Sequence, residues 1–542
     1  MAGFAALFLA LHAQGQKDTA GPKAVEIVSG FKPMLKESAK IYFGASPAPP
    51  DTSRRKLTYD IPNQNLLFAY QPGSLKPLAL DMDTSGAFDN SSYVKAGFGS
   101  LRTPLVQAGI TFGDGRSAGL NIYAKHVASE SKRPFQKFAE TSAELSGYFK
   151  VRKLEWNGAL GMRQDRTYKY GFEPQTLSFP EDSLKQNFQT ISARMGFRNI
   201  DKTEFGLTYA PVARISIFSD HLNNSESNTV VDLPLQKTIA KIFEVNLALG
   251  FDLTRLSPKN KSAINNTMYH IAPSVRFKTR KFNIQAGIRP TWDNGEFKMF
   301  PNVLAEIGTE DQRFFLHGGW TGYVRKTTYQ YLASQNPWLW LPSTFRNTWI
   351  EERFLGIRGS IGDHFTYATR VAVNRLKNQP LFVNDTAAAG GGKSFVVVNE
   401  PAMNVVQLGG EVGFNVEERF SLIAGWKINE YRGLKNNHRA WGLLPLEFNA
   451  AMRVQVLKDL FVNGDLFAWS GSQYMTRTGD NARLKGATDL NAGVEFRITK
   501  NLNLWAQFNN ITNKKYQRWN QYPVYGFSFL GGVVFSFDQK NK

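Results

Sequence analysis

The sequence predicts an all-β protein: a transmembrane antiparallel β-barrel of about 22 strands, preceded by a Pro-rich irregular segment. Three observations predict this fold. From residue 92 onward, stretches of about ten residues alternate between apolar and polar positions. Short charged turns alternate along the chain with longer irregular loops. Aromatic residues make up 13% of the 542 residues and 46 residues are Gly, a composition that favours strands over helices.

Composition excludes several other classes of protein. No window after residue 13 approaches the roughly 20 consecutive apolar residues that a membrane-spanning helix needs, which excludes a helical-bundle membrane protein. The aromatic content is too high for a chain that is disordered throughout. The chain contains no Cys, which excludes disulfides, thiol chemistry and metal sites with Cys ligands.

Two segments precede the expected barrel. Residues 1–13 form a short apolar run ending in Leu11-His12-Ala13, which resembles the core and cleavage site of a secretory signal peptide. Residues 14–91 are rich in Pro and contain the run SPAPPD at 46–51, which favours extended backbone over regular helix or sheet. We therefore expect an exported chain with a periplasmic or luminal segment at 14–91, the barrel at 92–537 and a short tail at 538–542.

The alternation is clearest in residues 243–254. One face of this expected strand is apolar, with Phe243, Val245, Leu247, Leu249, Phe251 and Leu253. The residues between them are small, polar or charged, from Glu244 to Thr254. The last expected strand repeats the pattern, with Leu530 and Val534 as apolar exceptions on its polar face. One polar and one apolar face per strand is typical of a membrane barrel.

The connections between the expected strands are of two kinds. Tight, charged turns are expected at 150–153, 199–202, 237–241, 279–281, 308–312, 362–364, 415–419, 457–459 and 498–501. Longer loops are expected at 165–185, 218–229, 325–349, 377–403, 431–441, 472–485 and 514–523. Short turns at one rim and long loops at the other indicate an outer-membrane barrel. A soluble propeller is less consistent, because no motif of 40–50 residues recurs.

The two ends of the expected barrel carry short motifs of a known family. The stretch LNLWAQFNNITNKKY at 502–516 and the final strand after it resemble the last two strands of TonB-dependent receptors. The stretch YVKAGFGSLRTP at 93–104 resembles their opening hairpin. The resemblance covers about residues 92–537 and implies an outer-membrane barrel of 22 strands in a Gram-negative bacterium. It also implies that the aromatic residues of the last strand are an insertion signal for the outer-membrane assembly machinery; these are Tyr525, Phe527, Phe529, Phe535 and Phe537.

The chain departs from that family in two ways. Residues 14–91 are too short and too rich in Pro for the usual four-stranded plug, and they contain no recognisable TonB box. The chain also continues past Phe537 with five further residues, whereas the family normally ends on an aromatic residue. The pattern resembles a plug-less branch of the family, in which a Lys-Pro segment such as Lys32-Pro33 precedes the barrel. Energy coupling through TonB is therefore not expected from these residues.

The sequence shows no catalytic, metal or cofactor motif. Its seven His residues are widely spaced and never occur as His-x-x-x-His, so we expect no metal site. The run GGGK at 390–393 lacks the frame of a phosphate-binding loop and is interpreted as a flexible loop. A Ser-His pair on one strand face, as in a barrel lipase, is not excluded by sequence, but nothing indicates it. We expect that the protein is not an enzyme and uses no cofactor.

The loop at 325–349 is unusually rich in aromatic residues. Two interpretations remain open: the rings join the interfacial girdle or pack within the loop, which is the more common case, or they bind a ligand or another protein. If a ligand exists, the expected contact residues are Tyr329, Tyr331, Trp338 and Trp340, above all the two Trp residues between Pro337 and Pro342.

Residues 92–542 carry 56 basic and 37 acidic residues, a net charge of +19. The favoured interpretation is pairing of basic rims with outer-membrane lipid headgroups, such as the phosphates of lipopolysaccharide. The alternative is a basic lumen, with Arg358 and Arg370 on polar positions, that favours anionic solutes. Nucleic-acid binding is not supported, because no run of Lys and Arg exists.

Two functions are consistent with these observations. The first, ranked ahead by the family resemblance, is transporter-like binding or passage of a solute across the outer membrane. The second is a structural or assembly subunit that anchors a periplasmic or surface partner. Because a barrel this wide is normally plugged, the lumen is expected to be filled by residues 14–91, by inward-folding loops, or by a periplasmic or lipoprotein partner.

Overall fold

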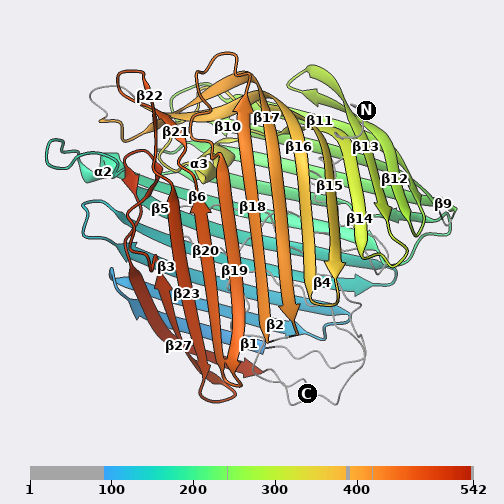
Figure 1. Ribbon diagram of the computed structural model, residues 1–542, viewed down its shortest axis with the longest axis horizontal. Helices are drawn as coiled ribbons and strands as arrows, with labels where there is room; N and C mark the ends of the chain where they lie inside the picture. Colours follow the sequence, from blue (N-terminus) through green and yellow to red (C-terminus); the bar gives the residue numbers. More distant parts are fainter. Residues whose placement is uncertain (1–90, 241, 386–390, 418, 539–542) are drawn as a thin grey trace.

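The computed structural model describes residues 91–240, 242–385, 391–417 and 419–538. This part of the chain forms a closed antiparallel barrel of 22 strands (Figure 1), so the predicted fold class and strand number are confirmed. The first strand, β1 (Ser91–Gly99), pairs with the last, β27 (Ser528–Asp538), from Ser91 opposite Asp538 to Gly99 opposite Leu530. Closure leaves no strand edge unpaired, as a sheet in lipid requires. The predicted signal peptide, almost all of the Pro-rich segment and residues 539–542 lie outside the described residues.

The strands follow one another around the wall in chain order. Those between the ends are β2 (Thr103–Gly113), β3 (Ala118–Glu130), β4 (Lys137–Val151), β5 (Leu154–Tyr168), β6 (Lys185–Asn199), β7 (Leu207–Tyr209), β8 (Val212–Asp220), β9 (Ser225–Ala240), β10 (Phe243–Ser257), β11 (Ile264–Lys278), β12 (Phe282–Asp293), β13 (Glu296–Gly308), β14 (Phe314–Arg325), β15 (Thr348–Ile361), β16 (Phe365–Asn384), β17 (Phe395–Val416), β18 (Phe420–Arg432), β19 (Leu446–Leu457), β20 (Leu460–Trp469), β23 (Ala487–Arg497) and β24 (Leu502–Asn509). β7 and β8 are one strand interrupted at Ala210-Pro211, since both pair with β9. The remaining elements lie in loops: α2 (Glu181–Leu184), α3 (Tyr329–Gln335), β21 (Gln473–Met475) paired with β22 (Asn481–Arg483), and β25 (Gln517–Trp519) paired with β26 (Tyr522–Pro523).

Short turns and long loops lie at opposite rims, as predicted, but two expected loops are mostly strand. The expected loop at 218–229 shrinks to residues 221–224, because β8 and β9 pair up to Ser219 opposite Ser225. The expected loop at 377–403 shrinks to 385–394, because β16 and β17 continue pairing up to Asn384 opposite Phe395. Pro and polar residues in these segments have the composition of loops, yet most of their backbone remains in the ladder.

The outward face of the wall is apolar and exposed. Residues such as Leu160, Met195, Phe251, Leu355 and Val371 are exposed large hydrophobics. Two rows of outward aromatic rings border this belt. At the short-turn rim the rings of Phe149, Trp156, Phe197 and Tyr209 follow one another with centroids 6.3, 4.7 and 6.0 Å apart. At the loop rim Tyr269, Trp292 and Phe297 do the same at 5.1 and 5.2 Å. An apolar belt between aromatic girdles is the surface that a lipid bilayer stabilises.

In the described part of the chain, no helix is long and apolar enough to cross a membrane.

The inward face is mainly polar, and many of its charges are paired. Arg358 contacts Glu306 at 2.6 Å, and Arg370 contacts Glu352 at 2.6 Å. The two arginines considered for a basic lumen therefore have carboxylate partners. Inward apolar side chains do occur at the seam of the barrel, where Leu530 and Val534 of β27 are buried in a cluster with Tyr93 and Trp505. That packing accounts for the two exceptions to alternation in the last strand.

Candidate functional site

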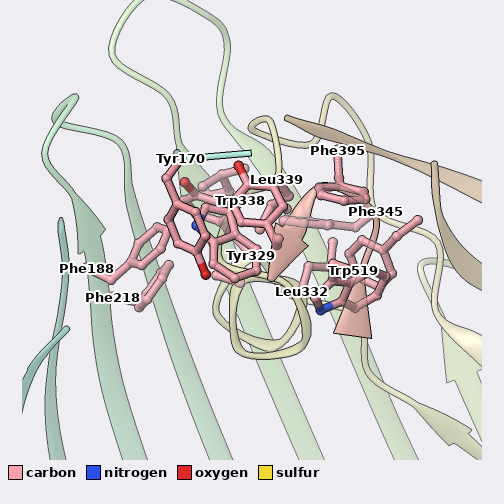
Figure 2. Close-up of a cluster of buried hydrophobic side chains, with 14 residues drawn as sticks. Tyr170, Phe188, Phe218, Tyr329, Leu332, Trp338, Leu339, Phe345, Phe395 and Trp519 are labelled. Carbon is pink, nitrogen blue, oxygen red and sulfur yellow. The ribbon is translucent and has the colours of Figure 1, made fainter. Parts of the chain in front are cut away.

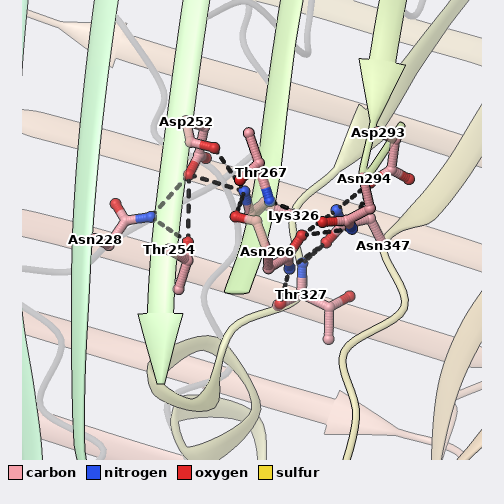
Figure 3. Close-up of polar contacts among 10 residues, drawn as sticks. All are labelled: Asn228, Asp252, Thr254, Asn266, Thr267, Asp293, Asn294, Lys326, Thr327 and Asn347. Carbon is pink, nitrogen blue, oxygen red and sulfur yellow. Dashed lines mark hydrogen bonds and ion pairs between the residues drawn. The ribbon is translucent and has the colours of Figure 1, made fainter. Parts of the chain in front are cut away.

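At the loop rim of the barrel, residues 326–347, called here the cap loop, pack against the inner side of the wall and the neighbouring loops. Its base is held by polar side chains from three neighbouring strands (Figure 3). Lys326 donates from Nζ to the carbonyl oxygens of Asp252 and Asn266 at 2.8 and 2.6 Å. At the other end of the loop, Asn347 donates to Asn266 at 2.7 Å and to Asp293 at 2.6 Å. Both ends of the cap loop are thus fixed to the wall formed by β10, β11 and β12.

The short helix α3 is held against the adjoining part of the wall, at β8 and β9. Thr328 caps the helix, accepting from the backbone N–H of Tyr331 at 3.0 Å. The carboxylate of Glu226, on β9, accepts from the N–H groups of Tyr329 and Gln330 at 2.5 and 3.0 Å. The hydroxyl of Tyr329 donates to Asp220 at 2.9 Å. Burial, reinforced by the charge of Asp220, raises the pKa of Tyr329 well above its ordinary value, so the hydroxyl stays protonated as a donor.

An aromatic core joins the cap loop to the other loops (Figure 2). The ring of Trp338 stacks on Tyr522 with centroids 3.7 Å apart, and Tyr170 meets the two rings edge-on at 5.7 and 4.9 Å. Tyr170 comes from the loop at 169–184 and Tyr522 from the loop at 510–527. The core also includes Phe188, Phe218, Leu256, Tyr329, Leu332, Ala333, Leu339, Phe345, Phe382, Phe395 and Trp519. Segments separated by more than 300 residues therefore meet in one hydrophobic cluster across the mouth.

Hydrogen bonds satisfy the polar atoms of this core. The indole N–H of Trp338 donates to the carbonyl oxygen of Tyr168 at 2.9 Å. The hydroxyl of Tyr170 donates to the carbonyl oxygen of Pro523 at 3.1 Å, and that of Tyr522 donates to the carbonyl oxygen of Lys393. A buried aromatic side chain with a satisfied polar atom holds one orientation, because leaving a buried donor unpaired costs about 1–3 kcal/mol. The loops at the mouth are therefore held together by specific packing.

On the cap loop, Trp340 differs from Trp338. Its side chain is 47% exposed, whereas that of Trp338 is fully buried. The ammonium of Lys169 lies 4.4 Å from the centre of the Trp340 ring, and the indole N–H donates to Asp385 at 3.0 Å. This arrangement leaves an aromatic surface beside a cation at the loop rim, a combination that binds flat or anionic ligands elsewhere in proteins.

Lys169 is buried close to a second cation, Lys393. Burial, together with the charge of Lys393, lowers the pKa of Lys169 to about 8, while Asp220 and Asp385 oppose the shift. Burial also lowers the pKa of Lys393, against the effect of Asp385. Two neighbouring buried lysines repel each other; Asp220 and Asp385 offset part of this repulsion, and a further anion beside the lysines would offset more of it.

The four aromatic residues predicted as ligand contacts separate into two pairs. Tyr329 and Trp338 are buried in the aromatic core, where they hold the cap loop in place. Tyr331 is half-buried, with the guanidinium of Arg325 5.8 Å from its ring centre, and Trp340 is exposed. Ligand contact by these residues stays a prediction, which the geometry favours for Trp340 and Tyr331.

The aromatic residues of the last strand also divide. Phe527, Phe529 and Phe535 are exposed large hydrophobics, and Phe537 stacks on Phe535 at 6.3 Å. Tyr525 does not share this outward face: it precedes β27 and packs edge-on against the buried Phe138 at 5.8 Å. The alternation breaks there because the strand begins only at Ser528. Recognition of this strand by the assembly machinery stays a prediction.

No motif in the sequence pointed to Tyr170, Tyr522, Phe395 or Lys169. The expected loops at 165–185 and 514–523 did carry a signal, since both are dense in Tyr and Trp or Phe, as is the loop at 325–349. Three aromatic loops on one rim of a barrel are close enough to form one core. Among the described residues, no group of three or more His, Asp or Glu side chains is arranged to hold a metal ion.

No protein-family model matches this sequence, and no curated protein matches it. Solved structures do resemble it. The FrpB iron transporter from Neisseria meningitidis has a TM-score of 0.65 at 10% identity, covering 87% of this chain and 85% of its own. The siderophore receptor PirA from Acinetobacter baumannii has a TM-score of 0.64 at 9% identity, covering 85% and 82%. The ferric-catecholate import receptor Fiu from E. coli K12 has a TM-score of 0.61 at 11% identity, covering 86% and 84%.

This chain has the barrel fold of the TonB-dependent receptors. At these identities the likeness concerns the fold, and the similar proteins are named as transporters or receptors rather than enzymes. The motifs at the two ends of the barrel, which resemble those of the same family, agree with this fold.

Proposed function

We propose that this protein is a receptor and transporter in the outer membrane of a Gram-negative bacterium, which binds a solute at its loop rim and passes it through the lumen. The observation that carries the proposal is the closed mouth: a polar lumen is sealed at the loop rim by the aromatic core and the cap loop. A seal built mainly from loops can open without disturbing the strand pairing of the wall, and loops of this kind commonly gate access to a site.

The orientation follows from the ends of the barrel. β1 begins and β27 ends at the rim of short turns, which faces the periplasm in outer-membrane barrels. The cap loop then faces the outside, where solute arrives. Trp340 and Tyr331 are the proposed solute contacts, and Tyr329 and Trp338 hold the loop behind them. Lys169 and Lys393 favour a solute that carries negative charge.

Planar-bilayer conductance of the full-length protein tests the proposal. The informative variant replaces residues 329–345 with a short Gly-Ser segment, which removes α3 and Trp338 but keeps the anchored base. The matched control shortens residues 476–480, the exposed turn between β21 and β22, which lies outside the aromatic core. We expect the full-length protein and the control to show only rare, brief openings, and the cap-loop variant to conduct in frequent discrete steps.

Two results would contradict the proposal. If the full-length protein conducts as strongly as the variant, the cap loop does not close the path. If the variant is silent, the cap loop is not the element that closes the path: residues 14–91 or a partner fill the lumen, or the protein is an anchor for a periplasmic or surface partner. Stable co-purification of a second chain would then support that structural role.

A further inference from the structure

The outer wall of β15, β16 and β18 carries four cations just above the apolar belt. These strands lie side by side with β17 in the wall (Figure 1). The cations are Arg353, Arg375, Lys377 and Arg432, called here the basic rim patch. Arg375 of β16 is opposite Glu351 of β15 and Asn404 of β17, and Asn404 is opposite Arg432 of β18. Arg375 and Arg432 are therefore two strands apart on one face, roughly 10 Å.

The register also places the patch at the edge of the membrane. A row of residues crosses the wall below the cations: Leu355 of β15, Val371 of β16, Leu408 of β17 and Ile428 of β18. Leu355 is two residues from Arg353, and Ile428 is four residues from Arg432. All four of these residues are exposed and apolar. Above them Trp320 and Trp349 lie beside the cations: Arg353 is 5.4 Å from the centre of the Trp320 ring, and Lys377 is 4.1 Å from that of Trp349. Trp residues next to an apolar belt mark the headgroup level of a bilayer.

The cations of the patch remain available to a ligand. The side chains of Arg353, Lys377 and Arg432 are 45%, 49% and 62% exposed. Their ion pairs with Glu351, Glu296 and Glu430 are at the surface, where such pairs contribute little stability and exchange readily. Arg375 is exposed and makes no ion pair with the described residues, although Glu351 is opposite it. Glu351 instead accepts from Trp320 and Arg353.

We propose that the basic rim patch binds the phosphate groups of lipopolysaccharide in the outer leaflet. This inference rests on the outer-membrane location and orientation proposed above. An acyl chain lying along Leu355, Val371, Leu408 and Ile428 brings a phosphorylated headgroup to the level of Arg375 and Arg432. A guanidinium binds phosphate through two parallel N–H···O bonds. The carboxylates in the patch limit its net charge, so binding depends on close phosphate contacts rather than on a general positive field.

Binding to the purified full-length protein tests the proposal. The probes are lipopolysaccharide with its lipid A phosphates, the same material after enzymatic dephosphorylation, phosphatidylglycerol and inorganic phosphate. We expect the phosphorylated glycolipid to bind on the order of tenfold or more tighter than the other three. The double variant Arg375→Gln with Arg432→Gln is expected to weaken its binding by on the order of a hundredfold, since two charged contacts are lost.

Two further variants complete the experiment. Arg375→Lys with Arg432→Lys keeps the charge but loses the paired N–H···O bonds, and is expected to bind more tightly than the Gln double variant and more weakly than the original protein. Arg166→Gln removes an exposed cation on β5, away from the patch, and is expected to leave binding unchanged.

Several outcomes would overturn the proposal. They are equal binding of phosphorylated and dephosphorylated glycolipid, equal binding of phosphatidylglycerol or inorganic phosphate, and a Gln double variant that binds like the original protein. The conductance of the cap-loop variant does not depend on this patch. Failure of the lipid site and failure of the transport proposal are therefore distinguishable.

Discussion

The loop end and the middle of the lumen are lined by the same strands but by different chemistry. At the loop end, the inward residues Phe188 of β6 and Phe218 of β8 are buried in the aromatic core. Farther from the mouth the inward residues are charged. On β6 the inward residue six positions from Phe188 is Arg194, and on β8 the inward residue four positions from Phe218 is Arg214. Arg214 pairs with Asp232 at 2.7 Å. On these two strands, hydrophobic packing is therefore confined to the mouth, and the wall below it is polar. We therefore expect mutations in the aromatic core to change how firmly the mouth is closed, and mutations in the polar wall to change ion selectivity.

The largest effect is expected at the centre of the aromatic core. Trp338→Ala should destabilise the closed mouth by about 3–5 kcal/mol, the usual cost of removing a buried aromatic side chain. The barrel wall keeps its strand pairing, so its melting behaviour should change little. Hydrogen exchange of residues 329–345 should accelerate strongly, with the wall strands still protected.

Trp340→Ala provides the control, because that side chain is exposed and outside the core. It should leave exchange of the cap loop nearly unchanged. Equal acceleration in both variants would show that burial of Trp338 does not hold the mouth closed.

Much of the wall was predictable from sequence, whereas the core of the mouth was not. The alternation from Phe243 to Thr254 sets which side chains face lipid, because a strand has a period of two. The partners of Trp338 cannot be obtained in this way. They are Tyr170, on a loop about 170 residues earlier, and Tyr522, on a loop about 180 residues later, and only the closed ring of strands brings them together.

The extra length of β16 and β17 escaped prediction for a different reason. The residues from Gln379 to Asn384 include a Pro and an Asn, which normally indicate a turn. Their pairing with Phe395 to Glu400 nevertheless continues, because several of these side chains are buried against the other loops. Tertiary packing here outweighs local preference.

A second, smaller effect is expected from pH at the mouth. Lys169 has a pKa of about 8 in the closed mouth and an ordinary value near 10.5 when hydrated. Opening the mouth therefore takes up a proton between these two pH values, so the closed state gains stability as pH rises from 8 to 10.5. The gain is at most about 3 kcal/mol.

Step conductance at pH 7 and pH 10 measures this change. Openings of the full-length protein should become rarer at pH 10. Lys169→Met removes the titration and should be nearly independent of pH in this range, with a mouth at pH 7 at least as closed as that of the original protein. If the Lys169→Met variant keeps the pH dependence, then that dependence comes from other groups of the mouth, such as Lys393.

The smallest effect on stability is expected in the lumen. Asp232→Asn removes the partner of Arg214. The side chains of Asp232 and Arg214 are 40% and 48% exposed. Because the pair is solvated, its loss should cost less than about 1 kcal/mol. The unpaired Arg214 adds a positive charge to the lumen, so the reversal potential of the cap-loop variant in a salt gradient should shift toward anions.

Glu204→Gln is the control. It removes an exposed carboxylate in the turn between β6 and β7, which makes the same change of charge outside the wall, and it should shift the reversal potential less. A large loss of stability with no change of selectivity would mean that this wall is packed like the mouth, and the contrast between the two regions would not hold.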